Sequence, residues 1–193
     1  MSEVAHIPQL RFPEFGGEWI NQKAGDFFEQ LSGFAFKGKD ISEEVGGTPI
    51  LRGINITEGL IRHSQKIDTY YLGDVSNLQK YIVQQGDIVL GMDGSKVGKN
   101  VAVVSSADAG SILIQRVARL RDNGVGCIQF IYHHIFSYRF HRYVDVVNTS
   151  SGIPHISSSQ INNFPIISPA KPEQQKIAAF LTAVDNKIEQ LSK

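Results

Sequence analysis

Short apolar segments separated by glycine-containing turns fill the middle of the chain. Four of them have the length and composition of β-strands: 49–56 (PILRGINI), 87–92 (DIVLGM), 100–104 (NVAVV) and 117–121 (VARLR). Turns at Gly46-Gly47, Glu58-Gly59 and Gln85-Gly86 bound these segments. Such a succession is typical of a multi-stranded, mostly antiparallel sheet.

Helical spacing of apolar residues first occurs before the predicted sheet. Residues 1–17 are polar and interrupted by prolines, which predicts an extended arm. The apolar residues of 23–31 then recur three and four positions apart, which predicts a short helix. Gly33 is a suitable C-cap for this helix.

A longer apolar face follows the sheet and predicts a helix over 127–144. We expect His134 on the apolar face of this helix, and His133 and His141 on its solvated face. The serine-rich segment 148–160 is expected to be a loop, and 163–167 a last strand.

The C-terminal segment has a different periodicity. Pro172 suits the first turn of a helix, where its missing N–H costs nothing. Apolar residues then alternate at intervals of four and three, the heptad spacing of a coiled-coil seam: Ile177, Leu181, Val184, Ile188 and Leu191. The sequence therefore predicts an α+β domain over 1–168, followed by a coiled-coil-type helix over 169–193. The chain ends at Lys193 without a C-cap residue, which leaves open a longer natural helix.

Composition narrows the class of protein. The 193 residues include 19 Lys and Arg and 19 Asp and Glu, so the formal net charge is zero. This excludes a wholly basic protein that coats nucleic acid by charge alone, but not a DNA-binding protein with one basic face. The single cysteine, Cys127, excludes an internal disulfide framework and fits a reducing compartment. Because the sequence has neither a membrane-length apolar run nor a signal-like start, we expect a cytoplasmic protein with no membrane contact.

Motifs for catalysis and for metal binding are missing from the sequence. The segment 94–99 (GSKVGK) has three residues between its glycines where a phosphate-binding loop has four, and Asn100 stands where that loop has Ser or Thr. We interpret it as a turn between two strands. The six histidines have no strong metal-ligand spacing, and the common hydrolase motifs are absent. We therefore assign no catalytic or metal-binding residue, and expect any active site to lie on another chain.

Polar side chains gather in three glycine-containing loops, 33–40, 92–100 and 149–160. Lysine reaches phosphates, serine and backbone N–H groups fix the position on the duplex, and His or Gln can contact base edges. The DNA-binding candidates are Lys37, Lys39, Ser95, Lys96, Lys99, Ser150, Ser151, His155, Ser157, Ser158, Ser159 and Gln160.

Local charge favours a basic face, because the segment 92–121 carries a net charge of +3. A less specific interpretation stays open at this point. The lysines and serines then lie at solvated turn tips, and Arg119 and Arg121 form the solvated side of a strand.

Several segments, taken in order, resemble the specificity subunit of type I restriction–modification systems. They are LRFPEF with the following EW (10–19), GFAFKGKD (33–40), ILRGINI (50–56), QGDIVLGMDGSKVGKNVAV (85–103), HISSSQINNFPI (155–166) and PEQQKIAAFL (172–181). The resemblance covers nearly the whole chain. Its most specific part is the last segment, which is similar to the start of the conserved helix of that family.

The resemblance implies a non-catalytic DNA-binding subunit. In the family, each of two target recognition domains binds one half of a split DNA sequence, and each precedes a long helix. The two helices pair antiparallel and set the distance between the half-sites. The implied partners are double-stranded DNA, methyltransferase subunits that use S-adenosylmethionine, and restriction translocase subunits that use ATP with Mg. No cofactor is implied for this chain itself.

This chain has one such domain and one helix, so it resembles a half-length subunit or a fragment. As a half-length subunit it is expected to form a homodimer, or to pair with a second half-subunit, through the C-terminal helix. Residues 172–193 would span ~33 Å as one helix, close to the ~34 Å of one turn of B-DNA. Two alternatives stay open: the recognition domain of a fused methyltransferase or nuclease, and a regulatory fragment that binds the methyltransferase without recognising DNA.

Overall fold

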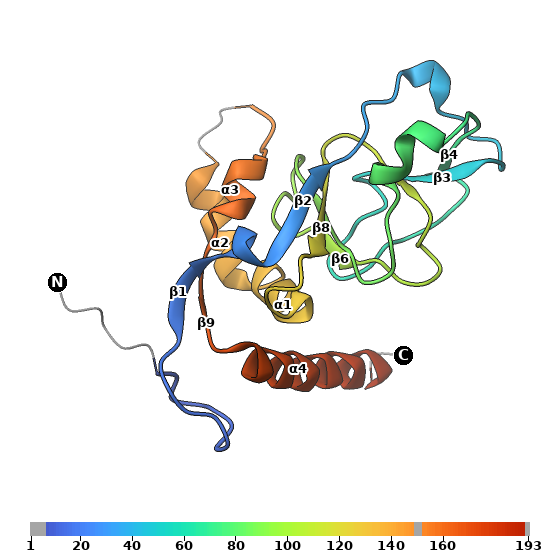
Figure 1. Ribbon diagram of the computed structural model, residues 1–193. Helices are drawn as coiled ribbons and strands as arrows, with labels where there is room; N and C mark the ends of the chain where they lie inside the picture. Colours follow the sequence, from blue (N-terminus) through green and yellow to red (C-terminus); the bar gives the residue numbers. More distant parts are fainter. Residues whose placement is uncertain (1–6, 149–151, 192–193) are drawn as a thin grey trace.

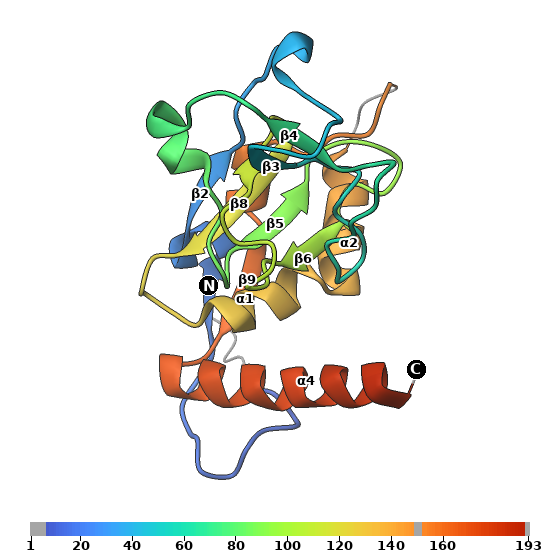
Figure 2. The same cartoon turned by 90° about the vertical axis from the view of Figure 1, so that its right-hand side faces the viewer.

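The structure is a computed structural model that describes residues 7–148 and 152–191. Its strands pair into three sheets, seen in Figures 1 and 2. The four-stranded sheet is antiparallel throughout, in the order β2 (Phe28–Ser32), β8 (Val117–Asp122), β5 (Ile88–Gly91) and β6 (Val101–Val103). A three-stranded sheet has the order β4 (Thr69–Tyr71), β3 (Thr48–Leu51) and β7 (Ile112–Leu113), with β3 and β7 parallel. The third sheet pairs β1 (Ile20–Lys23) with β9 (Pro165–Ser168).

The α-helices lie on one side of the molecule, away from the three-stranded sheet (Figure 1). The α-helices are α1 (Ile128–Ile135), α2 (Tyr138–Val147), α3 (Ser158–Asn162) and α4 (Lys171–Leu191). Short 3₁₀ helices are η1 (Ala24–Phe27), η2 (Gly38–Asp40) and η3 (Ser76–Tyr81). The helix α4 lies at one end of the molecule, as both ribbon views show. The structure thus confirms an α+β fold in which most strand pairs are antiparallel.

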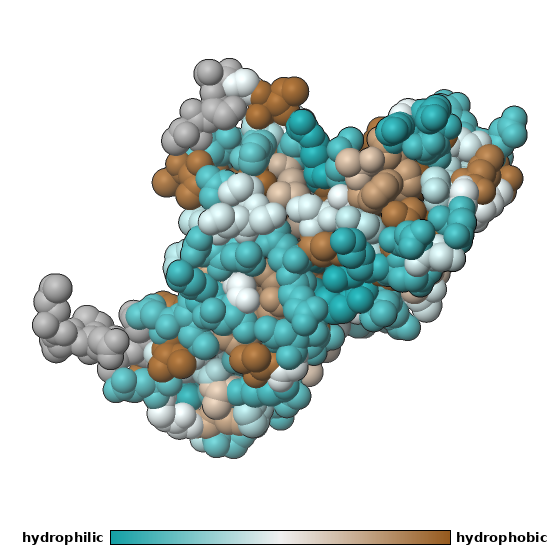
Figure 3. Space-filling view, turned by 45° about the horizontal axis from the view of Figure 1, so that its top comes forward, coloured by the Kyte–Doolittle hydropathy of each residue, from teal (hydrophilic) through white to brown (hydrophobic). Residues whose placement is uncertain are grey.

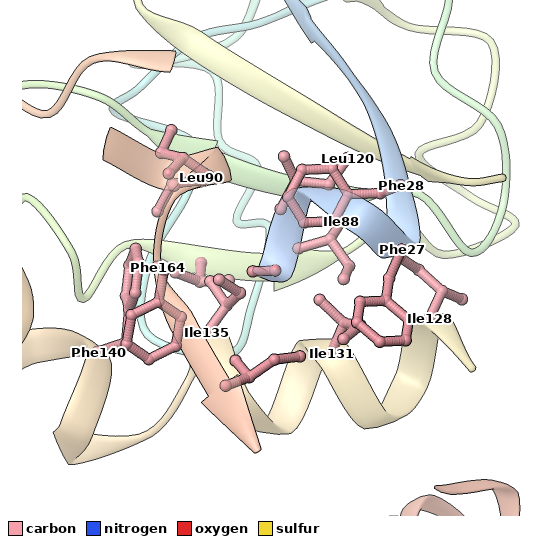
Figure 4. Packing of buried hydrophobic residues seen from close by; sticks show 14 of the residues in the cluster. Phe27, Phe28, Ile88, Leu90, Leu120, Ile128, Ile131, Ile135, Phe140 and Phe164 are labelled. Carbon is pink, nitrogen blue, oxygen red and sulfur yellow. The ribbon is translucent and has the colours of Figure 1, made fainter. Parts of the chain in front are cut away.

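The four-stranded sheet is the centre of the fold because it is buried on both faces. Successive strand residues point to opposite faces, so Ile88 and Leu90 of β5 join the main core, while Val89 joins a second cluster. In the main core these side chains pack against Ile131 and Phe140 of the helices (Figure 4). The second cluster packs the sheet against the layer that contains β3 and β7. The apolar segments that predicted strands in the middle of the chain therefore correspond to β3, β5, β6 and β8.

The predicted helix over 23–31 was wrong. The chain there forms the end of β1, the single turn η1 and the strand β2, and Phe28 pairs with Asp122 of β8. The apolar spacing of 23–31 fits a helix, and it also fits a turn followed by a strand. The pairing of β2 with β8, which is distant in the sequence, selects the strand. Gly33 is accordingly not a helix cap. A Cβ at Gly33 would lie 2.1 Å from the carbonyl oxygen of Ile114, so glycine permits a close backbone crossing.

The predicted helix over 127–144 is two helices. Ser137 ends α1 and begins α2, because its hydroxyl donates to the carbonyl of His134 and accepts from the N–H of Phe140. Burial lowers the pKa of His134 to about 4, and its half-buried ring packs edge-on against Phe130, as expected for the apolar face of the helix. The placement of His133 on a solvated face was wrong, since its ring lies 3.3 Å from the Thr182 hydroxyl of α4.

Two arginines of β8 are structural. Arg119 is 6% exposed and donates to the carbonyl of Lys80 in η3. Arg121 donates to both carboxylate oxygens of Asp87, at 2.8 and 2.7 Å, and to the carbonyl of Ile82. The expectation of a solvated strand face at these two positions was therefore wrong, and the local positive charge is smaller than the sequence suggests.

The helix α4 is attached to the domain by its first turn. The buried Gln174 accepts from the N–H of Cys127 at the start of α1 and donates to the carbonyl of Pro169. The buried Glu173 accepts two hydrogen bonds of 2.7 Å from Arg11 of the N-terminal arm. Gln174 lies seven residues before Leu181, so a buried polar residue occupies the first position of the heptad register, and together with Glu173 it holds the arm and the domain to the base of the helix.

A histidine between two carboxylates makes the stability depend on pH. The His63 ring lies 2.8 Å from Asp108 and 3.1 Å from Asp68, and it links loop 62–68 to loop 105–111. The hydrogen bond to Asp108, and after it the one to Asp68, raises the pKa of His63. A raised histidine pKa stabilises the fold at pH values below the unfolded-state pKa of about 6.5, and this stabilisation is lost as the pH rises through the folded-state pKa.

We therefore expect His63→Gln to lower the melting temperature more at pH 5.5 than at pH 8.5, because only the protonated imidazole is stabilised by both carboxylates. Calorimetry of both proteins at both pH values checks this. An equal difference at the two pH values would show that the ring acts through packing alone.

Candidate DNA interface

Three loops meet at the backbone of Met92, just after β5. The N–H of Met92 donates to the carbonyl of Arg116, and the carbonyl of Met92 accepts from the N–H of Ile156, at 2.9 and 2.8 Å. The N–H of Gly94 donates to the carbonyl of Pro154 at 3.0 Å, and Asp93 forms an antiparallel bridge with His155. The structure thus brings together the predicted loops 92–100 and 149–160, and adds the turn between β7 and β8.

The turn 94–99 connects β5 to β6, as the sequence predicted, and it packs against α2. Gly98 has φ +81°, and a Cβ at this position would lie 2.9 Å from a methyl group of Val144. Only glycine meets both conditions without strain. Ser95, Lys96 and Lys99 are exposed on this turn. The ammonium group of Lys96 lies 3.3 Å from Glu58, which offsets part of its charge.

The serine-rich segment contains a helix that the sequence analysis treated as loop. Ser157 is the N-cap of α3, and its hydroxyl accepts from the N–H of Gln160. The amide oxygen of Gln160 accepts in return from the N–H of Ser157, and its amide nitrogen donates to the carbonyl of Val147. This reciprocal pair is a capping box, so Ser157 and Gln160 hold the loop in shape and are poorly placed to leave it for a base.

The other candidates of this segment are placed differently. His155 is exposed. The Ser158 hydroxyl lies 3.4 Å from that of Ser32, and the Ser159 hydroxyl accepts from Asn163. Ser150 and Ser151 fall outside the described residues.

The first predicted loop, 33–40, begins beside the turn before β8, where Phe34 pairs with Ile114, and η2 lies on the lobe of the three-stranded sheet, away from the lobe of α2 and α3. Lys37 precedes η2, Lys39 lies in it, and both are exposed. Phe36 of the same loop is buried against Tyr71 of β4. Figure 1 shows this segment in light blue and the chain just before α3 in orange, both at the end of the molecule opposite α4. Figure 2 shows the same arrangement from the side.

Two adjoining clefts lie where the loops meet. One, of about 280 Å³, is lined by Ser32, Met92, Asp93, Arg116, His155 and Ile156. The other, of about 470 Å³, is lined by Arg52, Gly53, Ile54, Asp93, Ile114, Gln115 and Arg116. Asp93 and Arg116 belong to both. Figure 3 turns this end of the molecule toward the viewer and shows a largely hydrophilic surface between the two lobes.

An ion pair at the centre of the clefts was missed as a site by the sequence analysis. A terminal nitrogen of Arg116 donates to the Asp93 carboxylate at 2.9 Å. The sequence analysis counted Arg116 only as part of the local charge. The available signal was the polar pair Gln115-Arg116, which interrupts an apolar run between two strands.

The clefts are lined by side chains that can form hydrogen bonds. Within the ranges 7–148 and 152–191, no group of three or more His, Cys, Asp or Glu side chains is arranged to hold a metal ion. Exposed lysines, hydroxyls, an arginine and an imidazole surround an open, solvated surface. These groups can donate hydrogen bonds to phosphates and to base edges. In the described part of the chain, no helix is apolar enough over a sufficient length to span a membrane.

Fold and sequence comparisons agree on one class of protein. The structure is similar to the HsdS subunit from Thermoanaerobacter tengcongensis, with a TM-score of 0.65, 17% identity, and coverage of 98% of this chain and 42% of that one. A second similar chain comes from a structure of the type I R-M system that addresses complex assembly and conformational transition. Its TM-score is 0.65 at 15% identity, and the match covers 98% of this chain and 43% of that one. The fold is therefore that of a type I specificity subunit.

Residues 17–193 match the family model described as the type I restriction modification DNA specificity domain, and the chain belongs to this family. The chain is also 30% identical over 176 residues to the specificity subunit of the type I restriction enzyme EcoAI from Escherichia coli. That alignment covers 87% of this chain and 28% of the relative. The chain thus spans less than half the length of these proteins.

The capping box predicts a division of roles within the third loop. Ser157→Ala and Gln160→Ala should each lower the free energy of unfolding by about 0.5–2 kcal/mol, because a helix cap is lost. Ser158→Ala and His155→Ala, which remove no cap, should change stability little. Urea unfolding of the four variants measures this, and equal stability in all four would show that the capping box contributes nothing.

Proposed function

We propose that this chain recognises a specific sequence in double-stranded DNA and directs a partner DNA methyltransferase to it. The observation that carries the proposal is the convergence of polar loops at the end of the molecule opposite α4. Residues 1–168 would form the target recognition domain and 169–193 the helix for assembly. The proposal is supported by membership of the DNA specificity family.

The charge distribution fits contact with a duplex. Lys37, Lys39, Lys96 and Lys99 are exposed on loops at this end, whereas Arg119 and Arg121 are engaged inside the domain. Affinity would thus come from a few lysines at the edges of the interface, and sequence preference from side chains in the clefts. A protein with zero net charge achieves DNA binding in this way only if its positive groups are locally gathered.

The chemistry of modification and cleavage would belong to other chains. The partner methyltransferase subunits would use S-adenosylmethionine, and the restriction translocase subunits would use ATP with Mg. This chain would bind no cofactor of its own.

Methylome sequencing tests the function directly. A host that expresses this chain with its methyltransferase should acquire methylation at one defined motif, and a host with the methyltransferase alone should not. If the host that expresses both proteins shows no methylation at a defined motif, the proposal is contradicted. Incubation of the isolated chain with labelled S-adenosylmethionine and DNA should give no transfer, and transfer would favour a fused methyltransferase.

Lysine substitutions test the predicted DNA-facing turn. Lys96→Ala and Lys99→Ala should each weaken DNA binding by the complex and lower the slope of log affinity against log salt by about one unit. Glu58→Gln is a matched variant, because it removes the carboxylate beside Lys96 and should strengthen binding. Unchanged affinity and slope in both lysine variants would mean that the turn faces away from DNA.

We also propose that α4 forms an antiparallel homodimer, or pairs with a second half-subunit. The heptad seam is only partly covered within the chain. Ile177 and Leu181 share a cleft with the arm residues Phe12 and Trp19, whereas Val184, Ile188 and Leu191 are 39%, 58% and 76% exposed. An exposed apolar strip of this kind favours burial against another helix. Antiparallel pairing would place two recognition domains at opposite ends of the helix pair and give a palindromic split site.

A charged seam should abolish this association. Val184→Asp with Ile188→Asp should yield a folded monomer, because each buried apolar side chain contributes about 1.5–3 kcal/mol and carboxylates facing each other repel. These positions are preferred to Leu181, which also lines the cleft with the arm. The control with the same spacing is Asn186→Asp with Gln190→Asp, outside the seam. Light scattering at micromolar concentration measures the oligomeric state. If the wild-type chain is monomeric in the presence of the methyltransferase, the proposed homodimer is contradicted.

A further inference from the structure

We propose that Arg116 recognises a guanine of the target sequence and that Asp93 is its positioning residue. The inference deepens the proposed function and rests on it. It assigns sequence preference to a side chain outside the loops that the sequence singled out. Three features of Arg116 support this role: its backbone conformation, its ion pair and its place between the two clefts.

The backbone at Arg116 is strained. Among the residues that the structure describes, it is the one non-glycine residue with a positive φ, at +63°. A side chain in this left-handed region clashes with its own backbone, whereas glycine adopts it freely. The turn from Ile114 to Val117 imposes this conformation, because the Arg116 carbonyl accepts from Met92 and the Val117 N–H donates to Ile114. A long cationic side chain at a position suited to glycine points to a role for that side chain.

The ion pair with Asp93 does not account for the strain. The Arg116 side chain is 68% exposed, and exposed ion pairs contribute little to stability. The pair instead fixes the direction of the guanidinium. The backbone of Asp93 is held by the pairing of its segment with 154–156, so its carboxylate starts from a fixed point of the fold.

The carboxylate also selects the kind of DNA atom that Arg116 can bind. A phosphate placed against the free edge of the guanidinium would lie close to the negative charge of Asp93 and be repelled by it. The O6 and N7 atoms of guanine are neutral acceptors, and a guanidinium can bond both at once. Charge compensation therefore favours a base edge over the backbone for Arg116, in contrast to the exposed Lys99.

The place of Arg116 agrees with this assignment. It lines both clefts, between the lobe that carries η2 and the lobe that carries α3. Lysines at the periphery would contact the two strands of the backbone, and the centre of the surface would face the groove. His155 and Gln115 border the same clefts and would contact neighbouring base pairs.

Arg116→Gly separates fold from recognition in one substitution. Glycine relieves the strained φ, so the melting temperature should stay the same or rise. In complex with the methyltransferase, affinity for the wild-type motif should fall about 10- to 100-fold, and selection from a randomised DNA library should lose its preference at one guanine position. Affinity for unrelated DNA should fall much less, because the substitution only leaves the Asp93 carboxylate without its partner, and the salt slope should not fall by a full unit. Asp93→Asn should weaken the preference at the same position, and Arg142→Ala, an exposed arginine of α2, is the matched control.

Other outcomes would overturn the inference. A uniform loss of affinity for all sequences, with a salt slope lower by about one unit, would show a phosphate contact. A large drop in melting temperature would show a structural role. In that case Asp93→Asn decides, because it leaves Arg116 in place: an unchanged guanine preference in this variant contradicts the inference. A wild-type complex without any sequence preference would instead refute the proposed function, and the inference with it.

Discussion

The backbone of Met92 determines where the candidate interface forms. Its N–H and carbonyl bond to two different segments, the turn before β8 and the chain before α3. These segments lie more than twenty and more than sixty residues away in the sequence. Met92 directly follows β5 of the sheet that is buried on both faces. The two segments bonded to Met92 are therefore attached directly to the core. A recognition surface built on loops needs such an anchor, since each contact with DNA otherwise carries the cost of ordering the loop.

The opposite end of the molecule follows a different principle. The first turn of α4 is fixed by buried polar contacts, with Glu173 bonded to Arg11 and Gln174 bonded to Cys127. Beyond this turn the helix contacts α1 on one face and leaves apolar side chains exposed on another. The same helix can therefore be rigid relative to the rest of the chain and still offer a surface for another chain.

The strands of the buried sheet could be predicted from the sequence, because each is a short apolar run bounded by turns. The helix α4 could be predicted for the same kind of reason, since its heptad repeat is long. Prediction failed at 23–31 because the apolar spacing there fits both a helix and a strand. It also failed at Ser137, where the hydrogen bonds of one hydroxyl divide the predicted helix into α1 and α2. Ser157 and Gln160 stay predicted DNA-binding residues, but the sequence did not indicate that their side chains cap α3 and that Gln160 also bonds Val147. Arg116 could not be found from local sequence, because its partner Asp93 is brought to it only by the sheet.

Hydrogen exchange of the complex with its methyltransferase, with and without cognate DNA, tests the central claim that the loops around Met92 meet the duplex. The account predicts slower amide exchange on DNA binding in 92–99, 115–117 and 152–157, and no change in 184–191. Protection confined to 184–191, or loops that exchange equally fast with and without DNA, would contradict it.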